Sequence, residues 1–495
     1  MDSYAFLSTS SGNRYLYNAK HLSMINVHPA IEFIHKLHKN NDSDSLNSMV
    51  QAEYPYLTEE EVDTYIAKYD YLLNLGFFED MDIGSTLSGK VTTQTVENQL
   101  NNLDHIVFQV TSDCNFSCKY CCFGEMYDDD KTQIRHYMTI EKVKQTFAYF
   151  IPRWRANKKN NSSPRIVSVG FYGGEPLLNI SLIKETIEYC KELEVELSLQ
   201  FVYSMTTNGM LLDRYMDYIV ENNFSLLCSL DGDRKADSLR VNKRGEATFD
   251  KVFTNIRRLK REYPEYFKEK VNFSSVLNHN ATVEEVNRFI MDEFDKAPLI
   301  SPISEVGLKK EKFEEFTNIT NEYRETMEVI IARKEQSGRV KTLGGFFYYN
   351  LNNAFKHYSE LLHHTKRSEK KIPTGTCLPF YKKMYITADN KIFACERIES
   401  KYVLGTLDDA IHLDSEAIAA EYNKYLDFVK EQCMECYLAD TCSECIFQFP
   451  INKEGMPMCK YRYSKDMYQQ HLSAMFELLE TNPEIFEIAN KMVFA

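Results

Sequence analysis

Ten of the 13 cysteines in this 495-residue chain fall into two groups whose spacing suits metal binding. The first group is Cys114, Cys118 and Cys121, a C-x3-C-x2-C loop with Tyr120 just before its third cysteine. Three thiolates can hold three irons of a four-iron cluster and leave the fourth iron open to a substrate or cofactor. A zinc site that is one ligand short, or a set of buried cysteines, are the alternatives.

The second group lies near the carboxyl end of the chain. Its seven members are Cys377, Cys395, Cys433, Cys436, Cys442, Cys445 and Cys459. Zinc ribbons also use paired C-x2-C elements, so a two-zinc domain is the alternative to iron–sulfur clusters. Cys190 falls in a predicted helix and Cys228 in a predicted buried strand, where cysteine acts as a small hydrophobic residue.

The composition indicates a folded protein with reduced thiols. Hydrophobic residues make up 43% and charged residues 26% of the chain, as in ordinary globular proteins. A net charge of −14 argues against nucleic acid as the main partner. The sequence shows neither a secretory signal nor a long apolar run, so we expect a cytoplasmic protein with no membrane partner. Clustered cysteines in that compartment indicate metal ligands before disulfides.

From residue 103 onward the sequence alternates between predicted strands and amphipathic helices. The predicted strands are 105–111, 165–172, 197–206, 224–230, 270–277 and 298–303. The predicted helices between them are 138–154, 181–193, 211–223, 248–263 and 282–297. Six such units in succession predict a parallel sheet with helices outside, either open or closed into a partial barrel. In both arrangements the active site lies at the carboxyl ends of the strands.

Three short motifs stand at the ends of the second, third and fourth predicted strands. They are Gly173-Gly174-Glu175-Pro176, Thr206-Thr207-Asn208-Gly209 and Ser229-Leu230-Asp231-Gly232. Each motif alone is ordinary turn sequence. Together with the cysteine loop, and in this order over 103–303, they resemble the radical SAM superfamily.

That resemblance implies a fold, a cofactor and a chemistry. The fold is α/β, a partial (β/α)6 TIM-like barrel. In that family a 4Fe-4S cluster on three cysteines and S-adenosyl-L-methionine together supply a 5′-deoxyadenosyl radical, which abstracts hydrogen from an unactivated carbon. Cys114, Cys118 and Cys121 would be the catalytic cluster ligands. The residues implied to bind the cofactor are Tyr120, Gly173, Gly174, Glu175, Thr207, Asn208, Ser229, Asp231 and Arg240.

Four of these residues have expected roles. The two glycines would let the backbone approach the methionyl amino group of the cofactor, and Glu175 would accept a hydrogen bond from it. Arg240 would pair with the cofactor carboxylate, although an arginine is more often a solvated surface charge.

The seven later cysteines resemble the SPASM extension, which holds two auxiliary 4Fe-4S clusters, so that the chain would hold three in all. The family pattern gives Cys433, Cys436, Cys442 and Cys459 to one cluster. It gives Cys377, Cys395 and Cys445 to the other, which lacks an evident fourth cysteine. The usual spacing after Cys442 is x3 rather than the x2 found here, and no glycine lies five residues before Cys395. Cys122 is a candidate hydrogen-donating thiol if the enzyme is an epimerase.

Residues 1–80 form a predicted α+β module. A strand hairpin around 15–18 precedes a helix over 27–39, and a capping box at Thr58 opens a second helix. That helix should end near Gly76 and return as an apolar strand through Phe77 and Phe78. The module resembles the winged-helix recognition element fused to enzymes that mature ribosomally made peptides (RiPPs). This implies that a leader peptide adds as a strand to its sheet edge; a structural cap is the alternative.

The remaining segments complete the predicted organisation. Residues 81–102 are a polar linker, 304–370 a helical bridge, and 371–495 the SPASM domain followed by a helix over 464–493. Segment 371–462 is too poor in apolar residues for a core of its own, so we expect its fold to depend on metal.

The predicted function is radical modification of a precursor peptide with a leader sequence, through a thioether or another side-chain crosslink. A flavodoxin or ferredoxin would supply electrons. The alternatives are an anaerobic sulfatase-maturing enzyme, a peptide epimerase, or a non-enzymatic iron–sulfur or zinc protein that binds partners.

Overall fold

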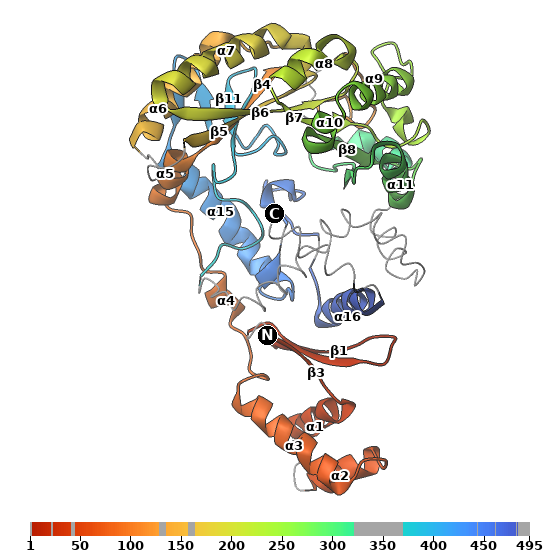
Figure 1. The fold of residues 1–495 in the computed structure, drawn as a ribbon. Coiled ribbons are helices and arrows are strands. Elements are labelled where there is room, and N and C mark those ends of the chain that lie inside the picture. The colour runs from red at the N-terminus through yellow and green to blue at the C-terminus, as the bar shows by residue number, and fades with distance from the viewer. Residues whose placement is uncertain are drawn as a thin grey trace.

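The computed structural model describes residues 2–20, 23–40, 45–127, 135–156, 164–320, 370–442, 444–460, 462–481 and 483. Most of the predicted helical bridge and the end of the predicted last helix lie outside these residues. A small three-stranded module lies at one end of the molecule, and a large sheet covered by helices lies at the other (Figure 1).

The large sheet has ten strands in the order β13-β12-β11-β10-β4-β5-β6-β7-β8-β9. Its parallel part is β4 His105–Thr111, β5 Arg165–Gly173, β6 Leu199–Thr207, β7 Ser225–Ser229, β8 Val271–Leu277 and β9 Leu299–Pro302. These six strands confirm the six predicted ones, and each pairs in parallel with its neighbour in the sequence. The class is therefore α/β with a mostly parallel central sheet.

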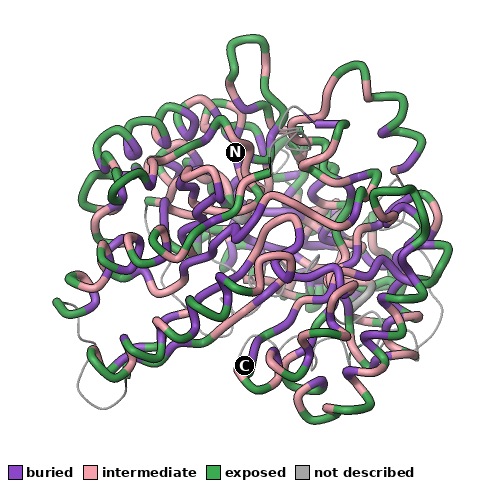
Figure 2. The backbone as a smooth tube through the Cα atoms, turned by 90° about the horizontal axis from the view of Figure 1, so that it is seen from above, coloured by how far each residue is buried: buried purple, intermediate pink, exposed green. Residues whose placement is uncertain are grey.

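Helices follow the strands and cover one face of the sheet (Figure 1). They are α6 Ile140–Ala156, α7 Ile180–Leu197, α8 Leu212–Glu221, α9 Phe249–Glu262, α10 Pro264–Lys270 and α11 Val283–Phe294. Alternate residues of β5, namely Val167, Val169 and Phe171, are buried in the main core, whereas Ile166 is 53% exposed. This period of two sends one set of side chains into the core and leaves the other on the opposite face. Figure 2 shows the buried backbone running through the centre of the molecule.

The cysteine-rich segment adds strands to this same sheet. β10 Met384–Ile386 pairs in parallel with β4, and three antiparallel strands continue the sheet outward. These strands are β11 Lys391–Phe393, β12 Gly405–Leu407 and β13 Ile411–Leu413, and α15 Ser415–Cys433 follows them. Ile386, Leu426 and Val429 are buried in the main core. The segment therefore shares the core of the neighbouring sheet, and its dependence on metal stays a prediction.

Segment 81–102 also differs from its prediction as a linker. It contains α4 Ile83–Thr86 and α5 Thr93–Asn102, and a capping box at Thr92 opens α5. Val96 and Leu100 are fully buried, and α5 packs against α6 and α15. Two apolar residues four apart suffice to fix a short helix in an otherwise polar sequence when neighbouring helices cover them.

The N-terminal module consists of β1 Tyr4–Ser8, β2 Arg14–Asn18, β3 Ser23–Asn26, α1 Pro29–Lys39, α2 Leu46–Glu53 and α3 Glu59–Asn74. The predicted hairpin, the first helix and the capping box at Thr58 are confirmed. Gly76 has φ +75°, and it allows the helix to end there. The apolar strand predicted after it is wrong: residues 77–78 form a turn whose Phe77 is buried in the module's core.

The last described helix, α16 Lys465–Thr481, lies against the module's sheet (Figure 1). The Gln469 side-chain amide donates a 3.2 Å hydrogen bond to the Phe6 carbonyl of β1, and the rings of Tyr17 and Tyr468 are 6.2 Å apart. Before the undescribed stretch, α12 Phe313–Ile319 belongs to the predicted bridge. None of the helices in the described ranges combines the length and apolar character needed to span a bilayer.

Candidate functional site

The first cysteine group lies directly after β4, in a loop that the structure folds tightly. Cys114, Cys118 and Cys121 are all partly buried. Burial raises the pKa of the Cys114 thiol, and the nearby Cys118 and Cys121 thiols raise it further. The structure thus brings together the three cysteines singled out by their spacing.

A second segment braces this loop through its backbone. The Ser117 N–H donates to the Val241 carbonyl at 2.7 Å, and the Lys119 N–H donates to the Leu239 carbonyl at 3.1 Å. The segment after β7 therefore runs beside the cysteine loop and fixes its course by main-chain hydrogen bonds.

Gly173 and Gly174 are required for a different reason from the predicted one. A Cβ on Gly173 would lie 2.3 Å from the Thr111 carbonyl oxygen, and one on Gly174 would lie 2.2 Å from the Asp113 carbonyl oxygen. Gly173 also has φ +156°. The glycines thus let the end of β5 approach the backbone that leads into the cysteine loop.

Glu175 ties together the ends of neighbouring strands. Its fully buried carboxylate accepts hydrogen bonds from the Thr207 hydroxyl at 2.8 Å, the Asn208 N–H at 2.8 Å and the Leu177 N–H at 3.1 Å. Burial raises the pKa of Glu175 to about 7, while these three donors lower it. Its donors come from the protein itself, a role that the sequence did not indicate.

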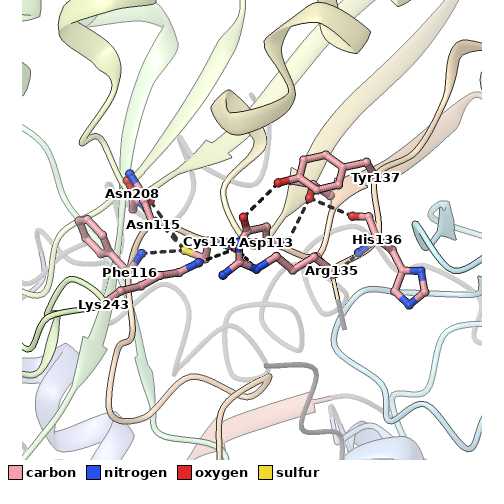
Figure 3. Close-up of polar contacts among 11 residues, drawn as sticks. Asp113, Cys114, Asn115, Phe116, Arg135, His136, Tyr137, Asn208 and Lys243 are labelled. Carbon is pink, nitrogen blue, oxygen red and sulfur yellow. Dashed lines mark hydrogen bonds and ion pairs between the residues drawn. The ribbon is translucent and has the colours of Figure 1, made fainter. Parts of the chain in front are cut away.

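Asn208 links this arrangement to the cysteine loop. Its side-chain amide donates to the Asn115 side-chain oxygen at 2.7 Å and lies 3.7 Å from the Cys114 sulfur (Figure 3). Ser229 lies half-buried at the end of β7, opposite Ser274 of β8.

Asp231, Arg240 and Tyr120 form a buried polar network. The Arg240 guanidinium donates to Asp231 at 3.0 Å, and the Tyr120 hydroxyl donates to the other oxygen of the same carboxylate. Arg240 is only 8% exposed, so the surface alternative for this residue is wrong. The neighbouring Asp231 carboxylate makes the burial of Arg240 possible, since a buried guanidinium requires anionic partners.

Asp237 is a member of this network that sequence reasoning missed. It lies 3.5 Å from the Arg240 guanidinium, and its carboxylate accepts a 2.9 Å hydrogen bond from the Asp231 N–H. Burial and the Asp231 charge raise the pKa of Asp237 to about 8. The available signal was the i, i+3 spacing of an acid and a base in Asp237-Ser-Leu-Arg240.

The later cysteines gather in two groups. Burial raises the pKa of Cys433, and with the contributions of three nearby thiols, those of Cys442, Cys436 and Cys459, the pKa reaches about 12. Burial likewise raises the pKa of Cys445, with a contribution from Cys377. The charges of Cys445, Cys377 and Cys395 all act on the buried Tyr422. The assignment of these cysteines to two clusters, which the SPASM resemblance implies, stays a prediction.

The other three cysteines are separate. Cys190 and Cys228 are fully buried, as predicted, and Cys122 is exposed beside the first loop.

The side chains at the cysteine groups indicate which kind of metal centre they could hold. Among the described residues, no three His, Cys, Asp or Glu side chains converge closely enough for a single metal ion. A four-iron cluster holds its ligands at separate corners, farther apart than the ligands of one ion, and thiolates are its usual ligands. Partly buried groups made only of thiols therefore fit iron–sulfur clusters.

Comparison with known proteins agrees with this geometry. Residues 108–291 match the radical SAM superfamily. The cysteine-type anaerobic sulfatase-maturating enzyme of Clostridium novyi (strain NT) is 24% identical over 234 residues, 44% of this chain and 59% of that enzyme. The chain thus spans about three fifths of that relative. The radical SAM cyclopropyl synthase TigE of Paramaledivibacter caminithermalis is 25% identical over 388 residues, 74% of this chain and 73% of that enzyme.

A solved structure shares the fold. The structure of native anSMEcpe with bound AdoMet covers 78% of this chain and 99% of that chain, with a TM-score of 0.51 at 20% identity. The sequence match over residues 108–291 includes the cysteine loop after β4 and the Gly173–Gly174 turn at the end of β5. The chain therefore carries a radical SAM superfamily domain, and residues 108–291 match that family.

Proposed function

We propose that this chain is a radical SAM enzyme that modifies a ribosomally made precursor peptide by forming a thioether or another side-chain crosslink. When bound, a 4Fe-4S cluster on Cys114, Cys118 and Cys121 and S-adenosylmethionine would supply the 5′-deoxyadenosyl radical. The observation that supports a peptide substrate is the N-terminal sheet: α16 covers one edge, and among the described residues no strand pairs with the other.

The covered edge is β1. Gln469 of α16 donates to the outward-facing Phe6 carbonyl, and Lys465 of α16 pairs with Asp2. The other edge is β3, and no strand among the described residues pairs with its outer side. An exposed edge is a template for another strand, and peptides are often bound in this way. A leader peptide would therefore add to β3.

The pairing pattern of β3 identifies the groups that would bind the leader. The Val27 N–H donates to the Arg14 carbonyl, so residues 27, 25 and 23 face β2 in the alternating antiparallel pattern. Met24 and Asn26 fall between them, and their main-chain groups face outward. These are the groups that would form hydrogen bonds with an added strand.

The C-terminal cysteines would hold two auxiliary clusters. Cys433, Cys436, Cys442 and Cys459 supply a complete set of four ligands. Beside Cys377, Cys395 and Cys445 the sequence offers no evident fourth cysteine, which leaves a coordination position for a substrate thiolate. That vacancy is the reason to place thioether formation ahead of other bonds, and a flavodoxin or ferredoxin would supply electrons.

The peptide proposal is tested by Met24→Pro, which removes one outward N–H at a position where an edge strand tolerates proline. Met24→Ala is the matched control, since it removes the same side chain and keeps the N–H. With a candidate precursor peptide taken from a neighbouring open reading frame, Met24→Pro should weaken binding about tenfold, as expected for a lost hydrogen bond. Both variants should release deoxyadenosine without peptide as the wild type does. Equal precursor affinity for both variants would contradict strand addition at β3.

Mass spectrometry of the co-expressed precursor identifies the reaction. Loss of two hydrogens indicates a crosslink, whereas an unchanged mass with altered stereochemistry indicates an epimer. Metal analysis addresses the non-enzymatic alternative. About twelve irons per chain, as three four-iron clusters require, together with deoxyadenosine release support the enzyme. Zinc without that activity contradicts it.

Sulfatase maturation is a second candidate, favoured by two relatives. Besides the C. novyi enzyme, the serine-type anaerobic sulfatase-maturating enzyme of Bacteroides thetaiotaomicron is 28% identical over 160 residues, 31% of this chain and 35% of that enzyme. Incubation with a sulfatase-derived peptide separates the two candidates. Formylglycine in that peptide, formed equally well by Met24→Pro, would favour sulfatase maturation.

A further inference from the structure

We propose that Asp113 is a positioning residue for Cys114, holding the first cysteine of the loop in a fixed direction and joining three segments around it. This inference rests on the proposed role of Cys114 as a cluster ligand. Asp113 lies between the end of β4 and Cys114, and only 13% of its side chain is exposed.

Both carboxylate oxygens of Asp113 are engaged (Figure 3). One oxygen accepts hydrogen bonds from the Cys114 N–H at 2.9 Å and the Lys243 ammonium at 2.6 Å. The other accepts from the Tyr137 hydroxyl at 3.0 Å. Arg135 forms an ion pair at 3.5 Å with the first oxygen. One side chain thus meets a cysteine backbone, two cations and a phenol.

These contacts fix Cys114 from its backbone, while others fix its sulfur. The sulfur accepts from the Phe116 N–H at 3.4 Å and lies 3.7 Å from the Asn208 side-chain nitrogen. A residue held at both its amide and its thiol has little freedom to turn away. Groups behind a metal ligand commonly provide this orientation.

The partners of Asp113 come from segments that also pair with the loop's backbone. On one side, the Ser112 N–H donates to the His136 carbonyl and the Met138 N–H to the Val110 carbonyl, both at 3.0 Å. On the other side, Lys243 follows the segment whose Val241 carbonyl accepts from Ser117. Asp113 lies where these two segments meet the cysteine loop, so its carboxylate holds all three together.

Two cations meet Asp113 at this junction. Lys243 lies 2.6 Å and Arg135 3.5 Å from the same carboxylate oxygen that accepts from the Cys114 N–H. Asp113 therefore also fixes these two largely exposed side chains next to the first cysteine.

The test compares Asp113→Asn with Asp113→Leu in the full-length chain. Asparagine keeps an oxygen acceptor for the Cys114 N–H, whereas leucine has a similar shape and no acceptor. Asp213→Leu is the matched control, because Asp213 of α8 forms a comparable 2.5 Å pair with Lys251 away from the cysteine loop. Hydrogen exchange of the peptide spanning residues 111–121 is measured in the iron-free chain, and iron content is measured after reconstitution.

Asp113→Leu should speed exchange at the Cys114 amide about tenfold, as expected for loss of one hydrogen bond. It should also lower the electron paramagnetic resonance signal that responds to S-adenosylmethionine. Asp113→Asn should largely restore both readouts, and Asp213→Leu should change neither.

Unchanged exchange in Asp113→Leu would overturn the positioning role. If Asp113→Leu showed faster exchange but kept full iron content and an unchanged resonance signal, Asp113 would order the loop without affecting a cluster. That result would overturn its role in positioning Cys114 as a ligand. If the wild type modified no precursor peptide while hydrogen exchange and the resonance signal behaved as expected, only the proposed substrate would be contradicted.

Discussion

The Asn208 backbone N–H donates a 2.8 Å hydrogen bond to the Glu175 carboxylate, and this bond joins the ends of β5 and β6 behind the cysteine loop. The same carboxylate accepts from the Thr207 hydroxyl. Asn208 in turn contacts Asn115 and the Cys114 sulfur. Through Asn208, the cysteine loop is therefore held by a carboxylate that is fully buried.

Replacing this carboxylate should change how stability depends on pH. Burial raises the pKa of Glu175 from 4.5 to about 7 in the folded chain. The folded state thus binds a proton more tightly than the unfolded state, and the free energy of unfolding should fall as pH rises from about 4.5 to about 7. The fall from this one group should be about 3 kcal/mol. Urea unfolding across this range should show a smaller fall in Glu175→Gln.

The comparison for Glu175 is Glu196→Gln, on the exposed surface of α7, which should keep the wild-type dependence. If Glu175→Gln and the wild type had the same dependence on pH, Glu175 would not be ionising in the buried site.

Arg240→Met should destabilise the fold by about 3–5 kcal/mol, because it leaves the buried Asp231 and Asp237 carboxylates without their cation. Arg234→Met is the matched control. Arg234 pairs with Asp250, but both side chains are largely exposed, so its loss should cost less than about 1 kcal/mol. Denaturant unfolding of the two variants measures the difference, and equal losses would contradict the burial of the Arg240 network.

The N-terminal module should become less stable in acid through His35. Its ring lies 2.6 Å from the Tyr4 hydroxyl and 3.2 Å from the Tyr69 hydroxyl, and it stacks on Phe78 with the ring centres 4.4 Å apart. Burial, together with the nearby Lys39 charge, lowers the pKa of His35 to about 4. The stability that the neutral ring contributes should be complete above about pH 6.5 and lost as pH falls towards about 4.

Limited proteolysis of the full chain measures this effect as cleavage within residues 1–80. Cleavage should rise on acidification in the wild type and rise less in His35→Gln, which cannot gain a proton. His412 is exposed and pairs with Asp409 in a different part of the chain. His412→Gln should therefore behave as the wild type does.

Iron content should separate ligand cysteines from structural ones. Cys442→Ser should lower iron by about four per chain, the content of one cluster, because the Cys433 group has four thiols and no spare. Cys190→Ser should leave iron unchanged, since Cys190 is buried between helix and sheet. Iron in reconstituted protein is the measurement, and equal iron in both variants would contradict the ligand role of Cys442.

Local sequence was enough to predict the six parallel strands, the helices between them and the capping box at Thr58. The strands and helices follow from the period of their apolar residues. The capping box follows from side chains that form hydrogen bonds with nearby backbone groups. The cysteine spacing likewise identified a first group of three thiols that the fold brings together. The strand expected at residues 77–78 failed because the buried Phe77 fills the module's core from a turn.

Only the tertiary structure decided what depends on contacts between distant segments. β10 joins the sheet through Tyr385 and its register with Val107 of β4, so a segment poor in apolar residues gains a core from its neighbour. Arg240 has the sequence surroundings of a surface residue, but Asp231 and Asp237 together make its burial possible. The sequence itself determined the elements and the chemical groups, because those follow from local geometry. The partners of each group came from the fold, because burial and charge pairing depend on residues that meet only when the chain is folded.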